Sequence, residues 1–256
     1  MLWLRIMVQR LLIGALTRLL GPQHPRVVDR LCILGDTARD ARKMSVAERA
    51  FRRALEIEDM RRPVRSPELA AILAKAGGLC LTPKRAGEAK AMFERALVLS
   101  EQGHPIGSDR LPPILDGLAQ AYRLLHEDAK AEALRRRALA LREAALGPDH
   151  PEVLNSVTRL GQVLSDLGKY DEAEPLFAGV VETQERLHGP ESLAVAAALD
   201  NLAYLLDQRG EFARSEVLYR RVVAIEKAVM KRPGLANVQI EGHRPAGPVE
   251  SSRARE

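Results

Sequence analysis

The stretch GPDHPEV at residues 147–153 has a near copy, GPQHPRV, at residues 21–27. The two copies lie 126 residues apart, which is three steps of 42 residues. Read in steps of 42, the sequence aligns with itself without a gap as far as about residue 231. This periodicity indicates one structural unit that is present in five copies, at residues 21–62, 63–104, 105–146, 147–188 and 189–231.

Each copy carries the start signal of a helix at the same position. The series is Pro25, Pro67, Asp109, Pro151 and Leu193, and the residue before it is His or Ser every time. Ser is a strong N-cap residue, and Pro is favoured in the first turn, where no backbone N–H is needed. The sequence therefore predicts that every copy begins its first helix at the same phase.

Small and bulky residues recur inside the copies in the same register. The first helix carries a small residue at Gly35, Gly77, Ala119, Gly161 and Ala203, four residues after an aliphatic one. The second helix carries a small residue at Ala47, Ala89, Ala131, Ala173 and Ser215, and four residues later Phe51, Phe93, Arg135, Phe177 and Tyr219. Small residues let two helices cross closely, and we expect the aromatic ring to fill the gap between one helix pair and the next.

The turn between the two helices has a glycine in only two copies, at Gly168 and Gly210. Glycine there permits the left-handed conformation that ends a helix. Arg42, Lys84 and His126 hold the same position in the first three copies. We expect those turns to be built differently or to carry strain.

Composition agrees with an all-α protein, because the chain is rich in Ala, Leu and Arg, and only 4% of its residues are aromatic. The net charge is +5, but acids and bases alternate along the chain as on solvated helix faces, which argues against a nucleic-acid partner. Cys32 and Cys80 are 48 positions apart, with no CxxC pair. They indicate reduced, packed thiols of a cytoplasmic protein, with no disulfide and no metal site.

The sequence contains no catalytic signature. GxxxxGK[ST], HExxH and GxSxG are all absent, and the six His residues are scattered. Three of these, His24, His104 and His150, precede a proline and suggest turns or helix caps. We therefore predict a protein that is not an enzyme and that has no cofactor.

The two ends of the chain differ from the repeats. Residues 1–20 are apolar but are interrupted by Arg5, Gln9, Arg10 and Arg18, so no run reaches the length of a membrane span. Two alternatives stay open for this segment: a helix that packs on the first repeat and caps it, or attachment to a membrane surface. Residues 232–256 are rich in Pro, Gly, Ser and charge, and are predicted to be a disordered tail.

A helix–turn–helix unit copied at this period resembles the tetratricopeptide repeat. The text LGPDHPEV, LGQVLSDLGKYDEAEPLF and VVETQERLHGPES resembles the kinesin light chain variant of that repeat, and the resemblance covers about residues 21–231. It implies an all-α solenoid, a right-handed superhelix whose concave inner wall is formed mainly by the first helix of each pair.

The resemblance also implies which residues line that wall. Mapped by register, they are Asp200, Asn201, Tyr204, Asp207 and Gln208 in copy five, Asn155, Thr158, Arg159 and Gln162 in copy four, Asp116, Gln120 and Arg123 in copy three, and Asp29, Asp36 and Arg39 in copy one. Asn201 matches the Asn of the family's NLA element, which reaches the backbone of bound peptide. Four aspartates of the set favour peptides that carry Arg or Lys: Asp29, Asp116, Asp200 and Asp207.

The leading hypothesis is a non-catalytic scaffold that binds a peptide or helix of a partner protein in the concave groove. A second hypothesis is a regulatory module that acts on a separate signalling or transcription protein. A third is a membrane-peripheral adaptor anchored through residues 1–20. The partner is unidentified, and exposed end helices leave a dimer possible.

Overall fold

The computed structural model describes residues 2–60, 67–103 and 110–231. Within these ranges the chain forms eleven α-helices and one short 3₁₀ helix, and no strand. The all-α prediction is therefore confirmed. The helices are α1 (Leu2–Leu20), α2 (Pro25–Asp40), α3 (Met44–Met60), α4 (Pro67–Leu79), η1 (Pro83–Arg85), α5 (Ala86–Gly103), α6 (Leu111–Leu124), α7 (Asp128–Leu146), α8 (Pro151–Asp166), α9 (Tyr170–His188), α10 (Leu193–Arg209) and α11 (Phe212–Met230).

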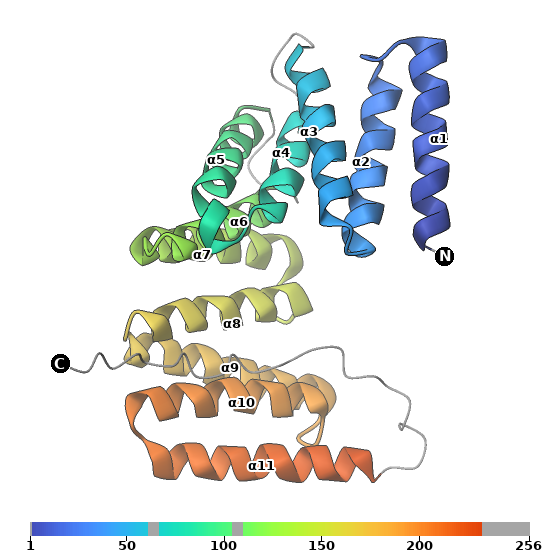
Figure 1. Cartoon of the computed structure of the whole chain (residues 1–256). Helices are drawn as coiled ribbons and strands as arrows, with labels where there is room; N and C mark the ends of the chain where they lie inside the picture. Colours follow the sequence, from blue (N-terminus) through green and yellow to red (C-terminus); the bar gives the residue numbers. More distant parts are fainter. Residues whose placement is uncertain (1, 61–66, 104–109, 232–256) are drawn as a thin grey trace, which may run out of the picture. The chain divides into compact units, whose positions relative to one another are not determined.

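The chain divides into two compact units, Met1–Val180 and Val181–Glu256. In the first unit, α2 pairs with α3, α4 with α5 and α6 with α7, and each pair packs on the next through α3 with α4, α5 with α6 and α7 with α8 (Figure 1). In the second unit, α10 and α11 form a pair. The first unit is thus a stack of helix hairpins, as the 42-residue period predicts, and the second unit contains one such hairpin.

The first helices begin with the predicted signals in three copies. His24 Nδ1 accepts a hydrogen bond from the backbone N–H of Arg26 at 3.2 Å, and His150 does the same for Glu152 at 3.2 Å. Ser192 Oγ accepts from Val195 N–H at 3.3 Å and caps α10. These side chains satisfy backbone donors that have no partner within the helix.

The prediction of a common phase is wrong for the third copy. Its first helix, α6, begins at Leu111 rather than at the position of Asp109, which lies outside the described residues along with Ser66, His104 and Ser108. Pro112 and Pro113 explain the later start. A proline has no N–H to donate, so both residues fit best in the first turn of a helix, and α6 starts immediately before them.

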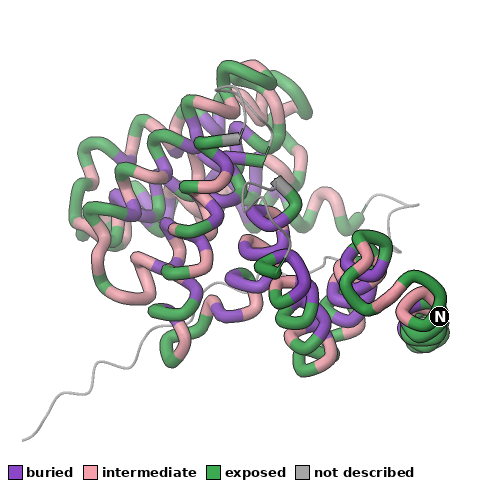
Figure 2. Tube along the Cα trace, turned by 90° about the horizontal axis from the view of Figure 1, so that it is seen from above, coloured by how far each residue is buried: buried purple, intermediate pink, exposed green. Residues whose placement is uncertain are grey.

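The aromatic rings are buried as predicted, but two of them pack on a glycine of their own helix pair rather than between one pair and the next (Figure 2 shows the buried inner faces). Phe51, Phe93 and Phe177 are at most 3% exposed. A Cβ atom added to Gly35 would lie 2.5 Å from the Phe51 ring, and one added to Gly161 would lie 2.8 Å from the Phe177 ring. The missing side chains are therefore what allows the two helices of a pair to approach each other.

Two of the three interhelix turns that lack glycine keep the left-handed conformation of the glycine turns. Gly168 and Gly210 have φ values of 72° and 85°, and the non-glycine residues Arg42 and His126 have φ values of 56° and 59°. The left-handed region is costly for residues with a side chain, so these two turns carry strain. Lys84, at the same position of the second copy, avoids the left-handed conformation because it lies in the 3₁₀ helix η1.

Helix α1 packs on α2 and buries Ile6 and Ile13, while most of its other side chains stay exposed. The predicted disordered tail, residues 232–256, lies outside the described residues.

Candidate partner-binding surface

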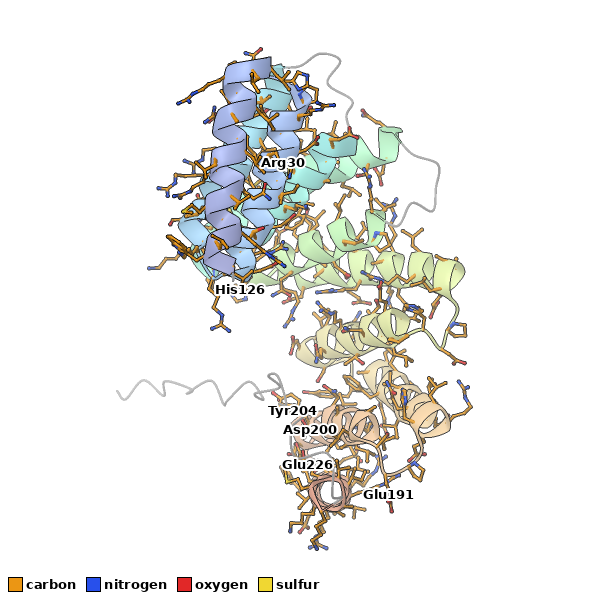
Figure 3. The ribbon with its side chains drawn as sticks, turned by 90° about the vertical axis from the view of Figure 1, so that its right-hand side faces the viewer. Arg30, His126, Glu191, Asp200, Tyr204 and Glu226 are labelled. Carbon is orange, nitrogen blue, oxygen red and sulfur yellow. The ribbon has the colours of Figure 1, made fainter. Side chains whose placement is uncertain are left out.

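Helix α10 presents five of the predicted groove residues on one side. Leu199, Ala203 and Leu206 are buried and fix the orientation of the helix. The predicted residues recur at helical spacing on the remaining face, and Asp200 and Tyr204, both labelled in Figure 3, are four residues and so about one turn apart. The set is Asp200, Asn201, Tyr204, Asp207 and Gln208.

Tyr204 is the prominent member of this surface, because 52% of the residue is exposed although it is a large aromatic side chain. Gln208 is exposed one turn later, and Asp200 is half-buried one turn earlier. Asn201 Nδ2 donates to the backbone carbonyl of Ala197 at 2.9 Å, so one donor of the amide is used by its own helix. The surface thus combines an aromatic ring with a carboxylate and two amides.

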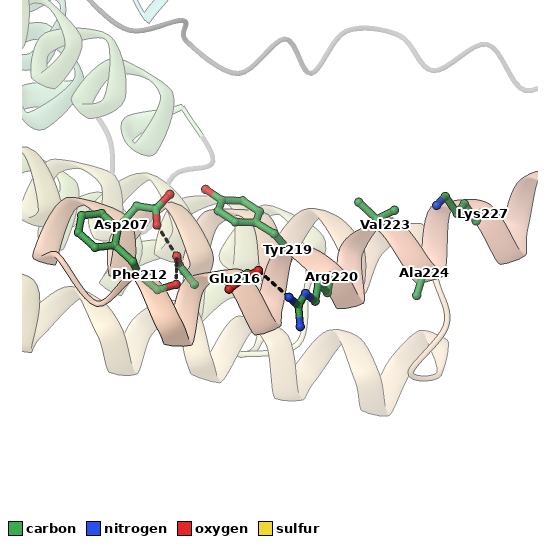
Figure 4. A pocket seen from close by; sticks show the side chains of 9 residues that line it. Asp207, Phe212, Glu216, Tyr219, Arg220, Val223, Ala224 and Lys227 are labelled. Atoms are coloured by element: carbon green, nitrogen blue, oxygen red, sulfur yellow. Dashed lines mark hydrogen bonds and ion pairs between the residues drawn. The ribbon is translucent and has the colours of Figure 1, made fainter.

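Asp207 joins this surface to a pocket of about 700 Å³ whose other lining residues all belong to α11 (Figure 4). Its Oδ1 accepts a hydrogen bond from Ser215 Oγ. Phe212, Tyr219 and Val223 give the pocket an apolar wall, and Lys227 lies at one end. Burial, reinforced by the negative charges of Asp207 and Asp200, raises the pKa of Tyr219 to about 12. The two carboxylates therefore make this face of α10 electronegative.

On α8, the predicted residues largely bond within their own helix. Thr158 Oγ1 donates to the carbonyl of Leu154 at 2.9 Å, and Arg159 Nε donates to Asn155 Oδ1 at 3.1 Å. Asn155, Arg159 and Gln162 are exposed. Helix α8 thus offers a polar, solvated face without an aromatic anchor.

On α6, the predicted acidic residue is already neutralised. Asp116 Oδ1 accepts from Arg135 at 2.6 Å and Asp116 Oδ2 accepts from Arg142 at 2.6 Å, and the carboxylate is only 18% exposed. Arg123 donates to Asp166 of α8, and Gln120 is half-buried. Asp116 is therefore held inside the array, and its carboxylate is committed to two arginines.

In the first copy, Asp36 is similarly engaged. Its Oδ2 lies 2.5 Å from Lys75 Nζ of α4, and its Oδ1 lies 3.3 Å from Arg39. Asp29 is exposed on α2. Of the four aspartates expected to favour basic peptides, Asp116 and Asp207 accept hydrogen bonds from side chains of this chain.

Arg135 has a structural role that the sequence indicated only because an arginine replaces the aromatic residue of the other copies. It takes the aromatic position of the third copy, is 4% exposed, and leaves Nε without a hydrogen-bond partner among the described residues. Burial lowers the pKa of the Arg135 guanidinium below its ordinary value, and Asp116 opposes that shift. Arg142 also donates to buried Ser156 at 2.9 Å, so the cluster ties α6, α7 and α8 together.

A second unpredicted feature is an ion pair that repeats between successive second helices. Arg95 pairs with Asp59, Arg137 with Glu101 at 2.7 Å, and Arg221 with Glu185 at 2.5 Å. The three pairs stand in the 42-residue register, with acid and base 36 residues apart. The constant spacing between acid and base is the pattern from which these ion pairs could have been predicted.

The described residues hold no group of three or more His, Cys, Asp or Glu side chains that could bind a metal. Cys80 is buried and Cys32 is half-buried, and burial raises the pKa of each thiol to about 11. Such thiols are poor nucleophiles at neutral pH. Among the helices of the described ranges, none has the length and apolar character that crossing a membrane requires.

The family model described as "Tetratricopeptide repeat" matches residues 112–177 and 154–228. The search of curated proteins finds no match to the sequence.

Solved structures share the fold at low identity. Nearly identical TPR-like repeats of a Podosopora anserina protein described as a kinesin light chain match with 19% identity and a TM-score of 0.75, over 82% of this chain and 99% of that chain. BtubC (BKLC) from P. vanneervenii matches with 20% identity and a TM-score of 0.73, over 97% of both chains. A Rap protein complexed with Competence and Sporulation Factor matches with 14% identity and a TM-score of 0.53, over 79% of this chain and 64% of that chain.

Proposed function

This chain is a tetratricopeptide repeat protein with a kinesin light chain-like fold, and from that premise we propose that it is a non-catalytic scaffold that binds an extended segment of a partner protein. The segment makes its main contacts with α10. The fold supports protein partners in general, and the side chains of α10 support this location.

The observation that carries the proposal is the half-exposed Tyr204 with Asp200 one turn before it and Asp207 about one turn after it. An aromatic side chain left in solvent between two carboxylates can contact an apolar residue of a ligand, while the acids attract a neighbouring Lys or Arg. Exposed aromatic residues are also the commonest anchors of protein interfaces.

Asn201 supports a ligand with an extended backbone. A side-chain amide both donates and accepts, so it can pair with the main chain of a peptide whatever the side chains of that peptide are. One of its donors already bonds to Ala197, which holds the amide in one orientation.

Regulation of a separate signalling protein is the second candidate function. Its support is the likeness to the Rap protein that was crystallised in complex with Competence and Sporulation Factor. Both functions use a surface of the array to hold another molecule, so the first experiment is the same for the two.

The test is selection of peptides by the full-length protein from a displayed random library, followed by titration of the selected peptides. We expect peptides that combine Lys or Arg with an apolar residue, and about tenfold or greater loss of affinity for Asn201→Ala with Tyr204→Ala, as for a truncated interface anchor. The matched control is Val217→Ala, which removes a 62% exposed side chain from α11.

Unchanged affinity in the Asn201→Ala, Tyr204→Ala variant would contradict the location on α10. Selection of acidic peptides, or of none, would contradict the proposed ligand chemistry. Equal losses for the control and the double variant would mean that the effect is one of stability, which thermal unfolding of each variant measures separately.

A further inference from the structure

Helix α1 exposes more large hydrophobic side chains than any other helix that the structure describes. Nine of the twenty-one large hydrophobic side chains that are exposed in the described residues belong to its nineteen residues. The set is Leu2, Trp3, Leu4, Met7, Val8, Leu11, Leu12, Leu19 and Leu20. A contiguous exposed patch of this kind marks a surface that contacts another molecule or a membrane.

The packing of α1 on α2 accounts for only a narrow strip of the helix. Ile6 and Ile13 are buried there, at 4% and 8% exposure. Leu4, Val8, Leu11 and Ala15 follow one another at intervals of four, three and four residues, so they form one stripe along the helix, and all of them are exposed. The helix therefore has two apolar faces, and α2 covers only one of them.

The charges of this region are all positive. Arg5, Arg10 and Arg18 are exposed on α1, and the first acidic residue of the chain is Asp29. Neighbouring residues of a helix are about 100° apart around its axis, so Arg5 and Arg10 lie on opposite flanks of the stripe, and Arg18 follows the stripe one turn after Ala15. Arginine side chains can extend from such positions to anionic groups while their stems remain on apolar surface.

We infer that the exposed face of α1 docks on an anionic lipid surface, with α1 lying in the plane of the interface. The stripe enters the boundary between headgroups and acyl chains, and the three arginines bind anionic headgroups. Trp3, 63% exposed, belongs to the residue type that is enriched at this depth. The inference is independent of the peptide surface on α10.

A second copy of the chain fits this face less well. Association of α1 with another α1 would bring arginines toward arginines, and the helix has no acid with which to pair them. An anionic surface complements the same charges. Charge complementarity is therefore what selects lipid over self-association.

The experiment uses Trp3, which is the single tryptophan of the sequence and reports only on this segment. The full-length protein is titrated with vesicles of phosphatidylcholine mixed with phosphatidylglycerol, and with vesicles of phosphatidylcholine alone. We expect a blue shift of Trp3 emission and flotation with the mixed vesicles. Removing the anionic lipid should weaken binding about tenfold or more, and added salt should weaken binding to the mixed vesicles.

Two variants separate the apolar and the electrostatic contributions. Leu4→Gln with Leu11→Gln changes exposed residues only, keeps Ile6 and Ile13, and should weaken binding about tenfold or more. Arg5→Gln, Arg10→Gln and Arg18→Gln together should remove the preference for the anionic lipid. The control is Val217→Gln with Met230→Gln, which alters exposed apolar residues of α11 and should bind as the unmodified protein does.

No blue shift with either vesicle overturns the inference. Equal binding of the Leu4→Gln, Leu11→Gln variant and the unmodified protein overturns it as well. Light scattering in the absence of lipid tests whether a second copy of the chain covers this face instead. A dimer that the Leu4→Gln, Leu11→Gln variant dissociates, combined with no vesicle binding, would assign the face to a second copy. Circular dichroism and thermal unfolding confirm that each variant keeps its helices.

Discussion

The ring of Phe93 on α5 lies against the backbone of Gly117 on α6, so closely that a Cβ atom at Gly117 would be 2.2 Å from the ring. The same ring also touches Gly77 of its own helix pair, where an added Cβ would be 3.0 Å away. One aromatic side chain thus packs between the two helices of the second pair, α4 and α5, and also contacts α6 of the third pair. The sequence register predicted the contact with the next pair, and the contact within the pair is an addition of the structure.

Gly117→Ala should destabilise the protein by about 1–2 kcal/mol. Overpacking against a rigid ring costs about 1–3 kcal/mol, and the better helix propensity of Ala returns up to about 1 kcal/mol. Gly179→Ala in α9 is the matched control, because nothing lies within 4 Å of its added Cβ. That variant should be neutral or stabilising. Urea unfolding measures both, and equal effects would contradict the packing role.

Asp116→Asn should destabilise the protein by about 3 kcal/mol or more, because it leaves the buried guanidinium of Arg135 without a counter-charge. Glu216→Gln is the comparison, since its pair with Arg220 is largely exposed at 63% and 75%. Such a surface pair contributes about 0.5 kcal/mol or less. Similar losses in chemical unfolding of the two variants would show that the Arg135 cluster is not a buried support.

His126→Gly should stabilise the protein by about 1 kcal/mol, because it relieves a left-handed backbone at φ 59°. The gain is the strain removed less the larger entropy that Gly loses on folding. Gly168→Ala occupies the same turn position one repeat later, at φ 72°, and should do the opposite. Thermal unfolding compares the pair. A fall in stability for His126→Gly would show that the imidazole has a contact that outweighs the strain.

The thiols of Cys32 and Cys80 should react slowly at pH 8. Burial raises the pKa of each to about 11 from 9.0, which lowers the thiolate fraction about 100-fold. Iodoacetamide should label the folded protein far more slowly than the protein in urea. Labelling at equal rates would contradict the burial of both side chains.

The same shift has a defined effect on stability. The unfolded thiols lose their protons at lower pH than the folded ones. The contribution of the two thiols to the free energy of unfolding is therefore fully present below about pH 9 and is lost as the pH rises through about 11. Unfolding free energies measured across that range, with Cys32→Ala and Cys80→Ala as the comparison, should show a shallower decline in the variant.

Period and residue size alone determined the all-α fold, the five helix hairpins and the positions where helices cross, since a repeated unit must meet its neighbour with the same side chains each time. The wall residues implied by the family resemblance lie on first helices, but their availability could not be read from the register. Asp116 and Asp200 hold the same repeat position, yet Asp116 is bound by two arginines, because Arg135 replaces an aromatic ring in its copy alone.

The later start of α6 and the second apolar face of α1 were also decided by tertiary structure. Two prolines shift the start of one helix, and contact with α2 determines which of the apolar residues of α1 are covered. A sequence period records what every copy shares. Charges, caps and exposed faces depend on which neighbours a particular copy meets, and only the packed chain brings those neighbours together.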